Sequence, residues 1–169
     1  MKPVWKFTNQ KELNEKQFIN YIERKVFRTI RKYSMLQKNK IITLKKSNDI
    51  NTAVLKKILE TKFQIKSTHN SQLTTHNSNN LSQITEDIFK NILKSNFNYK
   101  LQTTNYPLRL VSDKELELYA KLKNIKGTKR KQNKKIQSLF QKFLNKNQDL
   151  ELNILKAFSQ LSSSAHKNS

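Results

Sequence analysis

The sequence predicts a mostly helical protein with a few short strands. Apolar residues recur at spacings of three and four along most of the chain, which is typical of amphipathic helices. Only a few short runs are rich in the β-branched and aromatic residues that strands favour. The 169 residues are enough for one domain but short for two. A full doubly wound α/β domain needs more strands than this chain offers.

The longest predicted helix covers residues 13–36. Its apolar stripe follows helical spacing and consists of Phe18, Tyr21, Ile22, Val26, Ile30 and Tyr33. The same segment carries five cations within nine residues, namely Arg24, Lys25, Arg28, Arg31 and Lys32. An exposed cationic helix is suited to bind phosphate. In a chain that is basic throughout, the same charges are also expected on any solvated helix face.

The other elements are predicted in chain order. Residues 1–12, with Trp5 and Phe7, predict a short extended arm, and Ile41-Ile42-Thr43-Leu44 predicts a buried strand. Further helices are predicted over residues 50–61, 81–93, 112–122, 136–144 and 150–161, the third of them opened by the S-x-x-E capping signature of Ser112 and Glu115. Residues 106–111 are expected to be extended around their proline.

These elements predict four parts. Residues 1–65 hold the arm, the basic helix and one strand–helix pair. Residues 66–80 form a polar loop. Residues 81–161 form a C-terminal helical part, and residues 162–169 form a small, polar tail that is expected to be disordered.

Composition narrows the class of function. The formal net charge is +22, from 34 Lys and Arg against 12 Asp and Glu. A charge this large indicates a polyanion such as RNA or DNA. The chain has no cysteine and a single glycine, Gly127. These counts exclude disulfides, thiolate metal sites, cysteine-based sulfur chemistry and glycine-rich phosphate loops. No apolar run approaches the ~18 residues of a membrane span, and no signal peptide is expected.

The basic helix resembles the N-terminal helix of the tRNA 2-thiolation proteins. The matching residues, without a gap, are Leu13, Glu15, Phe18, Tyr21, Glu23-Arg24-Lys25-Val26, Arg28-Thr29-Ile30, Tyr33 and Leu36. That family comprises ATP-dependent PP-loop enzymes of archaea and the eukaryotic cytosol that place sulfur on a tRNA uridine. The resemblance implies that this chain is the remnant of an α/β PP-loop fold.

Three further blocks are similar to the same family, in the same order. Residues 75–80, T-H-N-S-N-N, resemble its G-H-N-x-D-D segment. The pattern P-L-x6-E-[VL]-x2-Y-A is matched by Pro107-Leu108, Glu115, Leu116, Tyr119 and Ala120. Residues 136–161 resemble the closing pair of helices. Together the four blocks cover about half of the chain.

Each departure from the family pattern removes residues that the family uses to bind zinc or nucleotide. Asn14 and Gln17 stand where the family has the last two zinc ligands, and amides do not hold zinc. The family loop S-G-G-K-D-S, which cradles ATP pyrophosphate, is here a glycine-free run within residues 45–52. The degenerate nucleotide-site positions are Lys45, Lys46, Ser47, His76, Asn77, Asn79 and Asn80. No catalytic residue, metal or cofactor is predicted, and His69 and His76 are expected to be solvated loop histidines.

The first functional hypothesis is a non-catalytic, reduced subunit or paralogue of the tRNA uridine 2-thiolation machinery. It would bind tRNA, a catalytic 2-thiolation homologue, or both. The alternatives are a small basic structural RNA-binding protein, such as a ribosomal protein of an organelle or compact genome, and a degenerate relic. The expected location is the cytoplasm, or an organelle or nucleomorph with an AT-rich genome.

Two clusters are predicted to contact RNA. One is the basic helix, and the other is the connector over residues 126–135. The connector cations are Lys126, Lys129, Arg130, Lys131, Lys134 and Lys135. Neither cluster is interleaved with exposed aromatic residues, so both are expected to contact phosphates rather than bases. The alternative for the connector is a solvated loop.

Overall fold

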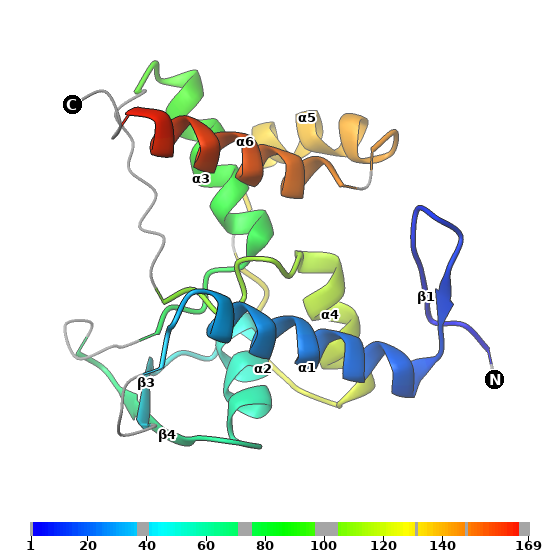
Figure 1. Cartoon of the computed structure of the whole chain (residues 1–169). Helices are drawn as coiled ribbons and strands as arrows, with labels where there is room; N and C mark the ends of the chain where they lie inside the picture. The colour runs from blue at the N-terminus through cyan, green and yellow to red at the C-terminus, as the bar shows by residue number, and fades with distance from the viewer. Residues whose placement is uncertain are drawn as a thin grey trace. The chain divides into compact units, whose positions relative to one another are not determined.

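The computed structural model confirms the predicted class, with helices over about half of the chain and a few short strands (Figure 1). It describes residues 2–36, 41–70, 76–96, 105–130, 132–147 and 149–165. The chain divides into two compact units. The first consists of Met1–Asn80 and Thr104–Arg130, and the second of Leu81–Thr103 and Lys131–Ser169.

This division differs from the expected boundaries, because helix α4 (Asp113–Leu122) belongs to the first unit. Sequence order places α4 in the C-terminal helical part. Its buried side chains Leu116, Tyr119 and Ala120 instead belong to the same hydrophobic core as Phe18 and Ile22. Burial of this apolar face decides which unit the helix joins.

The first unit begins with a hairpin and the basic helix. Strands β1 (Trp5–Lys6) and β2 (Glu12–Leu13) pair antiparallel, so the extended arm forms a small sheet. Helix α1 (Glu15–Lys32) follows and buries Phe18, Ile22, Val26 and Ile30 completely or nearly so, as its apolar period predicts. The predicted Tyr21 and Tyr33 lie at the border of this face and are half-buried.

A strand–helix–strand unit follows α1. Strand β3 (Ile41–Lys45) leads into helix α2 (Ile50–Leu59), and β4 (Gln64–Thr68) pairs parallel with β3. The expected polar loop over residues 66–80 therefore begins inside a strand. Sequence reasoning missed β4 because it has no buried side chain and no apolar alternation to reveal it. Leu44 also pairs with His76, so β3 has neighbours on both edges.

The segment before α4 is turned rather than extended, which corrects the prediction for residues 106–111. Arg109 N donates to Tyr106 O at 3.1 Å, and Val111 N donates to Leu108 O at 2.8 Å. These hydrogen bonds coil the chain so that Leu108 and Val111 are both buried. The predicted capping box is confirmed, with Ser112 as the N-cap of α4.

The second unit consists of helices α3 (Leu81–Leu93), α5 (Lys134–Leu144) and α6 (Leu150–Ala165) among its described residues. Helix α3 packs against both α5 and α6. The rings of Phe89 and Phe140 meet edge to face, with centroids 5.3 Å apart. Helix α6 continues to Ala165, beyond its expected end. A serine run ending in alanine tolerates helix once the preceding turns are formed, and residues 166–169 lie outside the described chain.

None of the helices among the described residues is long and apolar enough to cross a membrane.

Candidate nucleic-acid interface and nucleotide-loop remnant

The loop at the carboxyl end of β3 lies where open α/β sheets bind their ligands. It continues into α2 through Asp49, whose carboxylate caps that helix. Asp49 Oδ1 accepts from Thr52 N at 2.8 Å, and Asp49 Oδ2 accepts from Thr52 Oγ1 at 2.8 Å. The amide of Ile50 donates to the carbonyl of Thr128 at 3.0 Å. Two of the backbone donors that a phosphate would use at this helix terminus, the amides of Ile50 and Thr52, are therefore engaged within the protein.

Gly127, the single glycine of the chain, allows the segment after α4 to lie close to the loop before α2. Thr128 N donates back to Asn48 O at 2.8 Å, so the segment after α4 lies directly against the loop. A Cβ at Gly127 would meet Ile50 N at 2.9 Å and Asn48 O at 3.0 Å. The φ of Gly127 is not positive. Glycine is therefore required here for close backbone approach rather than for an unusual backbone conformation.

Gly127→Ala is accordingly expected to lower the free energy of unfolding by about 1–3 kcal/mol, because the added methyl group must push two backbone segments apart. Lys126→Ala is the matched control, since Lys126 is exposed in the same segment. It should change stability by less than about 0.5 kcal/mol. Amide hydrogen exchange of Ile50 and Thr128 should accelerate only in Gly127→Ala. Equal exchange rates in both variants would contradict the close approach.

Ser78 and Asn80 extend these contacts to α2 and α4. Ser78 Oγ lies 2.8 Å from Thr52 Oγ1, which connects this segment to the start of α2. The buried Asn80 donates through Nδ2 to Asp113 Oδ1 at 2.6 Å. An aspartate at position 80 would place a second carboxylate against Asp113 and repel it. The neutral amide is thus the residue that fits this contact.

Arg130 completes the network on the other side of Asp113. Its Nε lies 3.1 and 3.0 Å from the two carboxylate oxygens, and its Nη2 lies 2.8 Å from Oδ2. Both side chains are largely buried, with 12% and 16% exposure. The sequence predicts that Arg130 contacts RNA, whereas the structure pairs it with Asp113. The spacing of 17 residues gave no signal that they would meet.

His76 is not the solvated loop histidine that the sequence predicts. It is buried at 2% exposure, and its backbone pairs with β3. Burial lowers the pKa of the imidazole, and a hydrogen bond with the backbone of Met35 partly offsets that shift. The loop position that the sequence marked as nucleotide-facing thus supports the small sheet instead. His69 is exposed, as expected.

The pH dependence of stability should report this burial. A histidine with a lowered pKa binds fewer protons when folded, so stability rises with pH. The contribution of His76 should be fully present above its unfolded pKa of about 6.5 and should decline as the pH falls through the lowered folded value. His76→Asn should remove that part of the pH slope in denaturant unfolding between about pH 5 and 7.5. His69→Asn should keep it, and a wild-type slope in both variants would contradict the assignment.

The remaining positions of the degenerate site are open to solvent. Lys45, Lys46, Ser47 and Asn77 are exposed. Asn77 Oδ1 accepts from Asn79 N at 2.9 Å, which folds that loop onto itself. The two lysines can attract phosphate as point charges, but the loop has no glycine that would let a phosphate approach its backbone closely.

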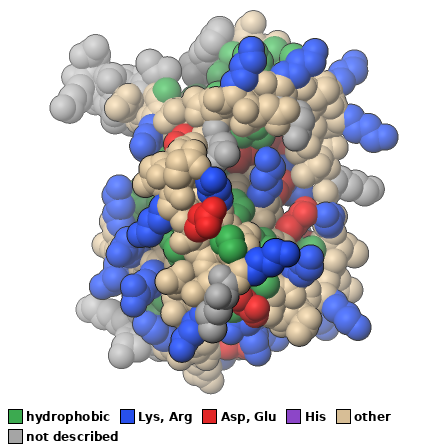
Figure 2. Space-filling model, turned by 90° about the vertical axis from the view of Figure 1, so that its right-hand side faces the viewer, with side chains coloured by type: hydrophobic (Ala, Val, Ile, Leu, Met, Phe, Trp, Pro, Cys, Tyr) green, Lys and Arg blue, Asp and Glu red, His purple; other side chains and the backbone are tan. Residues whose placement is uncertain are grey.

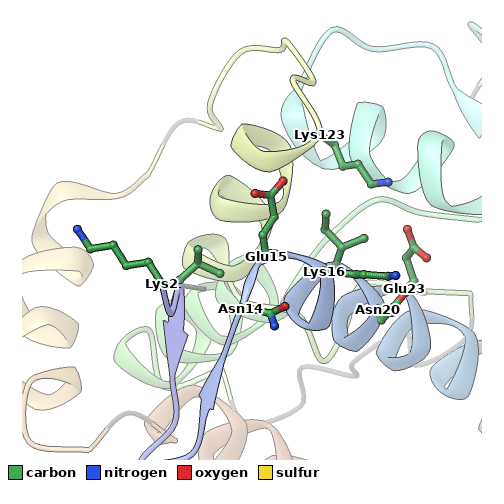
Figure 3. A pocket seen from close by; sticks show the side chains of 9 residues that line it. Lys2, Asn14, Glu15, Lys16, Asn20, Glu23 and Lys123 are labelled. Carbon is green, nitrogen blue, oxygen red and sulfur yellow. The ribbon is translucent and has the colours of Figure 1, made fainter.

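Asn14 and Gln17, at the positions of the family's zinc ligands, now start helix α1. Asn14 Oδ1 accepts from Gln17 N, and Gln17 Oε1 accepts from Asn14 N, both at 3.0 Å. This reciprocal capping box does not fit zinc. Asn14 also lines an open pocket of about 650 Å³ together with Lys16, Glu23 and Lys123 (Figure 3). The pocket walls carry both signs of charge, so they define no ligand class.

The basic face of α1 is formed by three arginines. Arg24, Arg28 and Arg31 are spaced by four and three residues on the side opposite the buried Val26, and all three are exposed. The described residues provide no salt-bridge partner for any of them. Lys32 is also exposed, with its ammonium 5.5 Å from the ring centroid of Tyr33. This face is available to an external anion.

Lys25 has a different role from the cations beside it. Its Nζ lies 2.7 and 2.9 Å from the two oxygens of Glu115, and Tyr21 Oη donates to the same carboxylate at 3.1 Å. Burial lowers the pKa of Lys25, but the Glu115 carboxylate and Tyr21 together outweigh it, so the net pKa is raised. Lys25 therefore holds α1 against α4 and contributes little to an external surface.

The connector cations are also divided by their contacts. Lys129 pairs with Glu117 at 2.7 Å, and Arg130 binds Asp113 as described. Lys126 is exposed in the first unit, and Lys134 and Lys135 are exposed at the start of α5 in the second. Lys131 lies outside the described residues. Lysine and arginine side chains are spread over the face shown in Figure 2, where acidic side chains are few.

Comparison with known proteins gives one informative result. No family model matches the sequence, and no curated protein matches it by sequence. The structure is similar to the U34-tRNA thiolase NcsA from Methanococcus maripaludis, solved with its [4Fe-4S] cluster. The TM-score is 0.70 and the sequence identity 12%, with 94% of this chain and 84% of that chain covered. The chain therefore has a tRNA-thiolase-like fold.

The donor set of this chain does not fit the cluster named for that thiolase. Iron–sulfur clusters are held by cysteine thiolates, and this sequence has no cysteine.

Proposed function

We propose that this chain is a non-catalytic, tRNA-binding subunit or paralogue of the tRNA uridine 2-thiolation machinery. The observation that carries the proposal is the occupied loop after β3 in a fold shared with a tRNA thiolase. Asp49 and Thr128 accept from two backbone amides at the start of α2, those of Thr52 and Ile50. A chain that keeps the architecture while filling this loop with its own groups is suited to binding rather than to nucleotide chemistry.

The RNA-binding part of the proposal rests on the arginine face of α1. Arg24 and Arg31 are about 10 Å apart along the helix axis, with Arg28 between them. Guanidinium groups bind phosphate in bidentate geometry and keep their charge at all physiological pH values. None of the three arginines is paired with an acid among the described residues, so these side chains contribute their full charge to the surface. We include Lys32 and exclude Lys25 from this interface.

A ribosomal or other structural RNA-binding role is the second candidate, favoured by the net charge of +22 alone. The two functions differ in what accompanies the protein in its own cell. Affinity isolation of the tagged chain, followed by sequencing of bound RNA and identification of bound proteins, is expected to recover tRNA and a cysteine-containing thiolation homologue. Ribosomal subunits in their place would support the second candidate. We place the protein in the cytoplasm or an equivalent compartment.

A further inference from the structure

Helix α5 presents an exposed aromatic residue beside a lysine stripe. Phe143 is 58% exposed, and Leu139, one helical turn earlier, is 43% exposed. Ile136 and Phe140 on the neighbouring face are buried. Part of the apolar surface of α5 is therefore not covered by the other helices of the second unit, and Phe143 is its most exposed residue.

The border of this apolar surface is positive. Lys135 and Lys142 are exposed and seven residues apart, which places them on one face of α5, about 10 Å apart along its axis. Lys146 is exposed just after the helix ends. Helix α5 contains no acidic residue. Helical periodicity places Leu139 and Phe143 between the lysine stripe and the buried face.

We propose that this surface of α5, formed by Phe143, Lys135, Lys142 and Lys146, binds single-stranded RNA by stacking an unpaired base on Phe143. Stacking platforms for single strands combine an exposed ring with cations that follow the backbone. An aromatic ring that is more than half exposed, beside lysines that pair with no acid among the described residues, has this composition. A second copy of the chain is disfavoured as the occupant, because two such lysine stripes would repel each other.

This inference deepens the proposed function and rests on it. It adds a stacking contact through Phe143, a residue that belongs to neither predicted cation cluster. An unpaired nucleotide of tRNA is the substrate class that such a platform takes, while the arginine face of α1 contacts phosphates.

The test compares two RNA probes with four forms of the full chain. The probes are an unstructured oligouridine and a blunt duplex RNA of the same length. The forms are the wild type, Phe143→Leu, Phe143→Trp and Leu139→Ala, each checked by circular dichroism. Phe143→Leu keeps an apolar side chain but removes the ring, and Leu139→Ala reports the effect of an apolar loss that involves no ring.

Phe143→Leu is expected to weaken oligouridine binding by about five-fold or more and to leave duplex binding unchanged. Phe143→Trp should bind oligouridine at least as tightly as the wild type, and Leu139→Ala should bind as the wild type does. Wild-type oligouridine affinity in Phe143→Leu would overturn the inference. So would an equal loss in Leu139→Ala, or wild-type self-association in sedimentation that Phe143→Leu abolishes.

Different results would contradict the inference on α5 and the proposed function. If tRNA binds through α1 while oligouridine binding ignores Phe143, the inference on α5 is wrong and the proposed function stands. If the chain has no affinity for tRNA, the proposed function is wrong, whatever the outcome with oligouridine.

Discussion

Glu115→Ala is expected to lower the free energy of unfolding by about 3 kcal/mol, because it removes the centre of a buried polar cluster. The Glu115 side chain is only 6% exposed and binds Lys25 with both oxygens. It also accepts from Ser112 N at 2.8 Å, which closes the capping box of α4. Removal of the carboxylate leaves the ammonium of Lys25 with little solvent and without this counter-ion. It also removes the ion pair between α1 and α4.

Glu117→Ala is the matched control for this prediction. Glu117 lies two residues further along α4 and also pairs with a lysine at 2.7 Å, but its side chain is 40% exposed and that of Lys129 is 69% exposed. Exposed pairs contribute little, so the loss should be about 0.5 kcal/mol or less. Urea unfolding of both variants gives the comparison. Similar losses in the two would mean that burial does not decide the strength of the Glu115 cluster.

The double variant Arg28→Glu with Arg31→Glu is expected to weaken tRNA binding by about ten-fold or more at moderate salt, because it replaces phosphate attraction by repulsion on the face of α1. Both side chains are exposed, so the helix content should stay unchanged in circular dichroism. Filter binding or fluorescence anisotropy with tRNA measures the change.

The control for that variant changes the net charge of the protein by the same amount, but on helix α2. Lys56 and Lys57 are exposed on α2, and Lys56→Glu with Lys57→Glu reverses the same number of charges. Its effect on tRNA binding should be clearly smaller. If the α2 variant weakens binding as much as the α1 variant, attraction is spread over the whole chain. If only reversal of Lys134 and Lys135 weakens binding, α1 is a packing element and the interface is misplaced.

Helices with a strong apolar period could be predicted from the sequence. The stripe of α1 from Phe18 to Ile30 and the capping box of Ser112 and Glu115 are local signals, so residues close together in the chain suffice to recognise them. Strand β4 could not be predicted, because it is a mostly polar strand with one partly buried apolar residue, Ile65, and its pairing with β3 is a tertiary contact. Turn formation at residues 106–111 likewise depends on burying Leu108 and Val111 against distant residues.

The candidate site could be predicted only in part, since charge is visible in sequence but ion pairing is not. Arg24, Arg28 and Lys25 look alike in a basic helix, and only the tertiary contact of Lys25 with Glu115 separates them. The contacts between Asn80, Asp113 and Arg130 join residues far apart in the chain. The sequence shows Gly127 as the single glycine of the chain but does not reveal its close contact with Ile50.

Equilibrium binding of tRNA as a function of salt, with and without magnesium-ATP, tests the central claim most directly. If exposed arginines on α1 bind phosphates and the loop after β3 is closed, the logarithm of the binding constant should fall steeply with the logarithm of salt concentration. At least three contacts predict a slope of about −2 or steeper. Magnesium-ATP at a concentration too low to screen charge should not change the affinity. A flat salt response, or tRNA binding that requires ATP, would contradict the account.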